Sequence, residues 1–145
     1  MSNDRPRTEP IGLRVQRVAK LLNRAFEDEL AAAGGSLPTW LILLSLKSGR
    51  PETQRELAKA VGIQGATMTH HLDALERTGL VTRTRDPSNR RVQRVELTQE
   101  GDAAFDRLRK VAVKFDQRLR TDLSDDELAR VGDVLDKLAR NVSGS

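Results

Sequence analysis

The chain has 145 residues, no cysteine, and a net charge of +4 from 25 basic and 21 acidic side chains. This length suits one domain, and the lack of cysteine excludes disulfides, thiolate metal sites, cysteine nucleophiles and cysteine-based redox sensors. The N-terminal sequence MSNDRPRTEP has no apolar core for a signal peptide, and the most apolar run, LPTWLILLSL, is too short to span a bilayer. We therefore expect a soluble, cytoplasmic protein with no membrane contact.

Two helices are predicted near the N-terminus. Residues 1–10 are expected to form a flexible arm, and apolar residues at helical spacing predict a helix over residues 11–33 that ends at the glycines of AAAGGS. A second helix is expected to begin near Pro38, a residue suited to a first helical turn, and to end at about Ser48.

The segment TQRELAKAVGIQGATMTHHLDALERTGLV, residues 53–81, has the pattern of a helix-turn-helix. Thr53 can cap the first helix with Glu56 as its capping-box partner, and Gly62 can end it. The second helix is predicted from about Gln64 to Thr78. Two short helices joined by a few residues that include glycine are typical of this motif.

The stretch RTRDPSNRRVQR, residues 83–94, holds five arginines and one acidic residue, a local excess of +4 that equals the net charge of the chain. A solvated charged loop, a basic tail and a hairpin could each account for it. The flanking segments LVTRTR and RVQRVEL have strand composition, and DPSN has turn chemistry. We therefore predict a two-stranded hairpin. Clustered positive charge is typical of nucleic-acid binding, although a solvated face is the commoner explanation for arginine runs.

Two further helices are predicted over residues 99–142. Thr98 can cap the first, and Ser124 with Glu127 forms a capping box for the second. The apolar stripes of these helices, and that of residues 11–33, can pack within the chain or against a second copy of it.

The second helix of the helix-turn-helix has a polar face suited to DNA. With Met68, Leu72 and Leu75 buried, the opposite side presents small and hydrogen-bonding residues. A threonine there can bond to a base edge or pack its methyl group against thymine; a solvated helix surface is the alternative. The predicted DNA-binding residues are Thr53, Gln54, Gln64, Thr67, Thr69, His70 and Arg77 in the motif, and Arg83, Arg85, Arg90, Arg91 and Arg94 in the hairpin.

The two histidines, His70 and His71, are adjacent on this helix and so point about 100° apart, which prevents them from chelating one metal ion together. His71 is expected to be half-buried. The sequence predicts no metal site and no cofactor.

Taken in order, these motifs resemble the multiple-antibiotic-resistance regulator (MarR) family of bacterial winged-helix transcription factors. LPTWLILLSL looks like the family's second helix, and RTRDPSNRRVQRVELTQEG resembles its wing and the Leu-Thr-x-x-Gly entry to the fifth helix. The resemblance spans roughly Ile11 to Val142. It implies a mainly α fold with a small antiparallel β-wing, in which a winged helix-turn-helix at 37–98 is flanked by dimerisation helices at 11–33 and 99–142, all in a single domain over 11–145.

The resemblance also implies a function. A homodimer would place its recognition helices in two successive major grooves of double-stranded DNA at a pseudo-palindromic operator and act as a repressor. Arg91 or Arg90 would enter the flanking minor groove, with the other wing arginines on phosphates. Two positions depart from the family pattern: Asn89 replaces an aspartate two residues before Arg91, and His70 replaces an arginine.

The resemblance further implies release by a small aromatic or phenolic acid bound between the dimerisation helices and the winged helix. Arg17, Trp40 and His71 are the candidate residues for that pocket, with a core role as the alternative for Trp40.

Two other functions remain open. The chain could be a winged-helix architectural or protein-interaction module without strong sequence specificity, or a regulator of another winged-helix family. An enzyme is not expected, because the sequence has no tyrosine, no glycine-rich phosphate loop and no histidine spacing for a metal.

Overall fold

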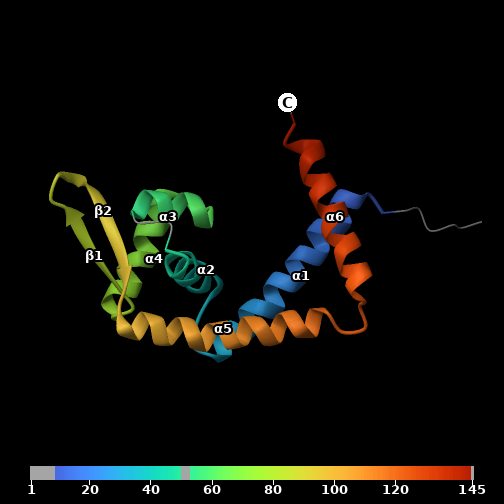
Figure 1. The fold of residues 1–145 in the computed structure, drawn as a ribbon, viewed down its shortest axis with the longest axis horizontal. Helices are drawn as coiled ribbons and strands as arrows, with labels where there is room; N and C mark the ends of the chain where they lie inside the picture. Colours follow the sequence, from blue (N-terminus) through green and yellow to red (C-terminus); the bar gives the residue numbers. More distant parts are fainter. Residues whose placement is uncertain (1–8, 50–52, 145) are drawn as a thin grey trace, which may run out of the picture. The chain divides into compact units, whose positions relative to one another are not determined.

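The computed structural model of the chain describes residues 9–49 and 53–144, so most of the arm predicted at 1–10 lies outside the described residues. Within the described part, helices and one antiparallel two-stranded sheet follow one another in the predicted order (Figure 1). The elements are α1 (Ile11–Ala32), α2 (Leu37–Lys47), α3 (Gln54–Val61), α4 (Gly65–Arg77), β1 (Val81–Asp86), β2 (Asn89–Leu97), α5 (Gln99–Leu119) and α6 (Asp125–Val142).

The chain divides into two compact units, one ending at Val111 and one beginning at Ala112. The boundary falls inside α5. The expectation of a single domain over residues 11–145 therefore stays a prediction. No single helix among residues 9–49 and 53–144 is long and apolar enough to cross a membrane; α1 and α2 meet that criterion only as a pair bent by 82°, by length and composition alone.

Local capping chemistry sets the helix ends, as predicted. The Thr53 hydroxyl accepts a hydrogen bond of 3.2 Å from the backbone N–H of Glu56, and Gly62 ends α3 in the left-handed region at φ 76°. At the start of α6, Ser124 and Glu127 form the predicted capping box. The predicted helix boundaries lie within about one residue of those observed.

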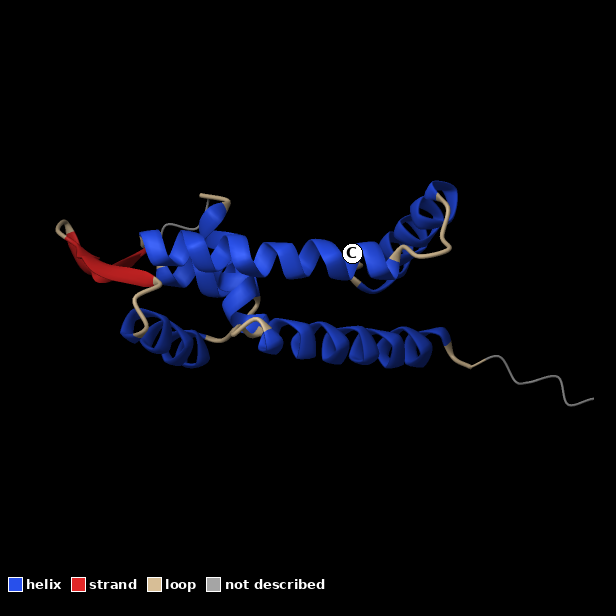
Figure 2. Cartoon of the chain, turned by 90° about the horizontal axis from the view of Figure 1, so that it is seen from below, coloured by secondary structure: helices blue, strands red, loops and turns tan. Residues whose placement is uncertain are grey.

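The arginine-rich stretch forms the predicted hairpin, drawn in red in Figure 2. The strands pair from Val81↔Leu97 to Asp86↔Asn89, with an irregularity in register between Arg85 and Asp86. The turn itself is shorter than the predicted DPSN, because Asp86 and Asn89 already pair with each other as strand residues. The arginines therefore lie on a defined β structure and not on a tail.

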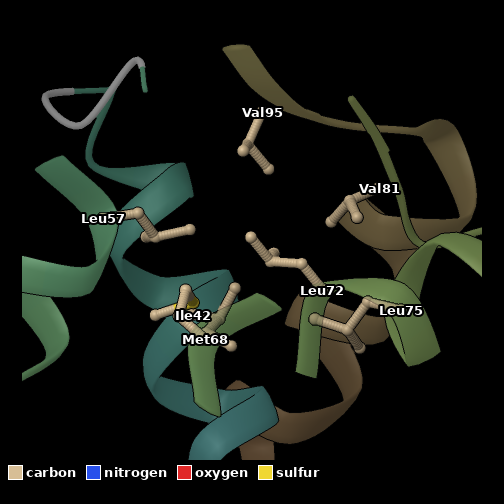
Figure 3. Close-up of a cluster of buried hydrophobic side chains, with 7 residues drawn as sticks. All are labelled: Ile42, Leu57, Met68, Leu72, Leu75, Val81 and Val95. Carbon is tan, nitrogen blue, oxygen red and sulfur yellow. The ribbon is translucent and has the colours of Figure 1, made fainter. Parts of the chain in front are cut away.

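One apolar cluster joins the helix-turn-helix to the hairpin (Figure 3). The predicted buried face of α4 is confirmed, since Met68 and Leu72 are fully buried and Leu75 nearly so. These side chains pack with residues from α2, α3 and both strands, namely Ile42, Leu57, Val81 and Val95. Burial of this face fixes the opposite face of α4 outward and holds the hairpin beside it.

Gly101, in the first turn of α5, lies against the backbone of the segment that follows α4. Its N–H donates to the Thr98 hydroxyl at 3.0 Å, and the N–H of Thr98 donates to the carbonyl oxygen of Leu80 at 3.1 Å. A Cβ atom on Gly101 would lie 2.1 Å from that same carbonyl oxygen, so backbone would have to move to admit it. The glycine of the Leu-Thr-x-x-Gly pattern is thus required by close approach of two backbone segments.

We predict that Gly101→Ala destabilises the protein by about 2–3 kcal/mol, because overpacking against a backbone carbonyl forces a shift of the main chain. Urea denaturation monitored by circular dichroism measures this. Gly12→Ala is the matched control: nothing lies within 4 Å of a Cβ there, and alanine favours the helix. Equal midpoints for wild type and Gly101→Ala would contradict the prediction.

Candidate nucleic-acid interface

A groove of about 1220 Å³ runs between the helix-turn-helix and the hairpin. Residues of α3, α4 and both strands line it, and seven of the twelve predicted DNA-binding residues are among them: Thr53, Gln54, Thr69, Arg83, Arg85, Arg90 and Arg91. The other five, Gln64, Thr67, His70, Arg77 and Arg94, do not line it. The structure therefore brings the helical and hairpin candidates together along one surface.

The outward face of α4 is solvent-exposed where the sequence places the recognition residues. Thr67, Thr69, His70 and Arg77 are all exposed, and Gln64 is exposed at the N-cap position. His71 is half-buried, as predicted. This face is free to meet a ligand along the length of the helix.

Sequence reasoning missed Arg55, which is exposed in the first turn of α3 and lines the same groove. The cap at Thr53 already fixes which residues of α3 turn outward, so a helical wheel drawn from that cap could have found Arg55.

Arg83 has its charge compensated within the protein. Its side chain is only 14% exposed. The guanidinium bonds to the carboxylates of Asp73 and, at 3.1 Å, Glu76, while the backbone N–H of Arg83 donates to Glu76 at 3.2 Å. Burial acts to lower the pKa of Arg83, but the bonds to Glu76 and Asp73 outweigh it and the pKa is raised. The same hydrogen bond from Arg83 lowers the pKa of Glu76. Because Asp73 and Glu76 belong to α4, these ion pairs hold β1 against α4. A guanidinium engaged in this way is not placed to bind a phosphate.

Arg94 also has an acidic partner. Its guanidinium lies 3.1 Å from the carboxylate of Asp86, across the hairpin. Two of the five hairpin arginines are therefore paired. The sequence count of +4 already subtracts Asp86, so it is the pairing of Arg83 with acidic residues of α4 that lowers the effective positive charge of the hairpin further. Within the described residues, Arg85, Arg90 and Arg91 form no ion pair; Arg85 donates to the backbone carbonyl of Arg90 at 3.2 Å.

Asn89 orients the backbone and not the guanidinium of Arg91. Its side-chain oxygen accepts a hydrogen bond of 3.2 Å from the N–H of Arg91. Asp86 carries the turn instead, because its carboxylate accepts from the Ser88 N–H at 2.8 Å and from the Ser88 hydroxyl at 2.6 Å. The carboxylate that stabilises the hairpin turn thus belongs to Asp86, three residues before Asn89.

These bonds hold the pKa of Asp86 at about 2, below its ordinary value of 3.8, through the Ser88 hydroxyl first, then the Ser88 N–H and Arg94. A depressed folded-state pKa stabilises the hairpin above pH 4, and the contribution is lost as pH falls through about 2. We predict that carboxyl NMR titration finds this low pKa and that Ser88→Ala moves it up towards 3.8. An unshifted Asp86 would contradict the assignment.

The structure does not gather the three predicted effector residues. Arg17 is exposed and pairs with Glu9 at 2.6 Å, in a shallow hollow on α1 that includes neither of the other two. Trp40 is 8% exposed and stacks on Phe105 with ring centroids 5.6 Å apart, as its alternative core role requires. His71 lies on α4. Among the described residues no group of three His, Asp or Glu side chains is placed to hold a metal ion.

Comparison with known proteins agrees with this architecture. A family model described as the MarR family matches residues 36–92. The transcriptional repressor CouR, solved bound to a 23-mer DNA duplex, is 30% identical, with 97% of this chain and 99% of that chain covered and a TM-score of 0.83. A mutant MarR from E. coli complexed with operator DNA is 25% identical, with coverage of 90% and 94% and a TM-score of 0.81.

A third similar structure was solved with a ligand. The PcaV transcriptional regulator from Streptomyces coelicolor, in complex with its natural ligand, is 27% identical, with 91% of this chain and 92% of that chain covered and a TM-score of 0.72.

Proposed function

The chain belongs to the MarR family of DNA-binding transcriptional regulators, which are not enzymes, and from this premise we propose that it is a homodimeric, cytoplasmic repressor of a pseudo-palindromic operator. The observation that carries the proposal is a single groove that joins the exposed face of α4 to hairpin arginines, namely Arg85, Arg90 and Arg91, that have no acidic partner among the described residues. Such a surface combines side chains that can hydrogen-bond to base edges with positive charge that can neutralise phosphates of the DNA backbone.

The groove and the exposed residues of α4 beside it have separate roles in the proposal. Thr67, Thr69 and His70 on α4 read base edges in the major groove, with Gln64 and Thr53 near the phosphates. Arg91 and Arg90 enter the minor groove beside it, where negative potential is high. Arg85 neutralises phosphate.

The apolar surfaces of two helices support a dimer. None of the residues of α6 is buried, although Val131, Val134 and Leu135 repeat at helical spacing and are 52%, 51% and 46% exposed. On α1, Ile11, Leu13, Val18, Leu21 and Leu22 are also exposed. Apolar stripes of this size favour burial against a partner, and a second copy of the chain supplies that partner in the proposal. Two-fold symmetry then requires a symmetric operator.

A small aromatic or phenolic acid, as the family resemblance implies, is the proposed effector. A related regulator solved in complex with its natural ligand supports control by a ligand. The ligand would act only through a different affinity for the DNA-competent and free forms of the dimer. Tryptophan fluorescence of Trp40 during titration with aromatic acids, together with operator binding, tests this; no quenching and no release of DNA would contradict it.

The test of the main proposal is selection of duplexes from a random pool, followed by titration of the selected site at several salt concentrations. We expect a pseudo-palindrome with half-sites about 10 bp apart and a log–log salt slope of about −0.9 for each phosphate contacted. A repressor should prefer this site over random duplex by about a thousandfold or more. Equal binding to both would favour the architectural alternative.

A further inference from the structure

The hydroxyl of Thr69 is fully engaged as a donor inside the protein. A threonine hydroxyl has one O–H to donate, and that of Thr69 donates to the backbone carbonyl of Gly65, one helical turn earlier, at 3.0 Å. The same oxygen accepts a hydrogen bond of 2.7 Å from the side-chain amide of Gln54 on α3. A base acceptor could gain the Thr69 proton only if the bond to Gly65 were broken.

The exposed part of Thr69 is therefore apolar. The residue is exposed on the outward face of α4 and lines the groove. Its oxygen is directed to Gly65 and Gln54, so the group that it leaves for a ligand is the methyl group. In the major groove the apolar group that a base presents is the 5-methyl of thymine.

We propose that Thr69 recognises a thymine in each operator half-site through contact between the two methyl groups, and that Gln54 is the positioning residue that holds Thr69 in that orientation. This inference rests on the proposed function, since it requires α4 to lie in the major groove. A threonine can recognise a base through its hydroxyl or through its methyl group, and this inference assigns the methyl group to Thr69.

The state of the Gln54 amide supports its positioning role. Its nitrogen donates to Thr69, while its oxygen is shielded from solvent and has no hydrogen-bond partner among the described residues. The amide is thus committed to the contact between α3 and α4 and does not present its oxygen to DNA in this arrangement.

The experiment replaces each thymine of the selected operator, one position at a time, by deoxyuridine. Uracil keeps the O4 acceptor and lacks only the 5-methyl group. The wild-type chain should lose affinity by about fourfold at one thymine per half-site, the effect of one buried methyl group. Fluorescence anisotropy of labelled duplexes measures this ratio.

Two variants separate the methyl group from the hydroxyl. Thr69→Ser keeps the hydroxyl and should bind the thymine and uracil duplexes equally at that position. Thr69→Val keeps the methyl group and should retain the roughly fourfold preference for thymine. Circular dichroism and thermal unfolding establish that both variants are folded.

The opposite pattern would overturn the proposal. If Thr69→Ser behaves as wild type on both duplexes and Thr69→Val loses affinity, the hydroxyl is the reading group. If no thymine position changes its sensitivity in Thr69→Ser, Thr69 reads no methyl group, even though operator binding itself stands. If no duplex is bound specifically, the proposed function fails and this inference fails with it.

Gln54→Ala tests the positioning role by the same ratio. Release of the Thr69 side chain should reduce the thymine preference below fourfold, whereas a merely structural role for Gln54 would weaken both duplexes equally. An unchanged preference would overturn the role of Gln54 and leave that of Thr69 in place.

Discussion

Replacement of Arg90 and Arg91 together by alanine is expected to weaken operator binding by about a hundredfold at physiological salt. These two arginines lie at the start of β2, next to the hairpin turn, and have no acidic partner within the described residues, so their charge is available to DNA. A dimer would lose four such charges. The log–log salt slope should become shallower by about 0.9 for each lost phosphate contact. Titration of wild type and variant at four or more salt concentrations measures both quantities.

The control removes two positive charges elsewhere. Arg109 and Lys110 are exposed on α5 and outside the groove, so Arg109→Ala with Lys110→Ala changes the net charge equally. Only a small loss of affinity, from the weaker general field of the protein, is expected for it. If the Arg90 and Arg91 variant binds with unchanged affinity and slope, the hairpin does not contact DNA and the proposed interface is wrong.

Local signals in the sequence were sufficient to predict the helices and strands but not to predict which arginines form ion pairs. Caps and glycines act over three or four residues, which is why Thr53, Gly62 and Ser124 mark helix ends correctly. An arginine's partner depends on which elements meet in space. Asp73 lies on a different element from Arg83, so a count of charge along the hairpin treats Arg83 as free when it is paired.

Strand alternation held a signal for Arg83 that the charge count ignored. Residues two apart in a strand share a face, so Arg83 lies on the same side of β1 as the buried Val81. The next residue on that side, Arg85, lies nearer the turn and is exposed. Along one face of β1, a buried apolar residue is therefore followed by a paired arginine and then, nearer the turn, by an exposed arginine.

Whether the three effector candidates lie together could not be read from the sequence, for a different reason. A pocket between helices is defined by tertiary packing, and the sequence offered only residue types. Trp40 was a candidate because it is the sole tryptophan, but the structure stacks it on Phe105 in the interior. The large apolar area of an indole ring favours such burial over a polar site.

Introduction of aspartate at Val131 and Leu135 of α6 is expected to leave the protein monomeric and to reduce operator binding by about a thousandfold. Both side chains lie on one stripe of the helix and are about half exposed in the single chain. Burial of that stripe in a dimer would place two carboxylates per subunit in an apolar interface, at a cost of several kcal/mol. Loss of the dimer also removes the gain in affinity from two linked half-site contacts. Sedimentation equilibrium gives the mass, and anisotropy gives the affinity.

The opposite face of the same helix supplies the matched control. At 100° per residue, Ala129 and Arg140 lie about 160–180° from Val131, and Ala129→Asp with Arg140→Gln changes the charge by the same two units. This variant should remain dimeric and bind DNA with little loss. Circular dichroism should show equal helix content in both variants, which separates loss of the interface from loss of α6 itself. A dimer that persists at micromolar concentration with aspartate at Val131 and Leu135 would show that α6 does not form the interface. The symmetric operator would then require another apolar surface, and the exposed apolar residues of α1 and of α5, among them Val113 and Leu119, are candidates for it.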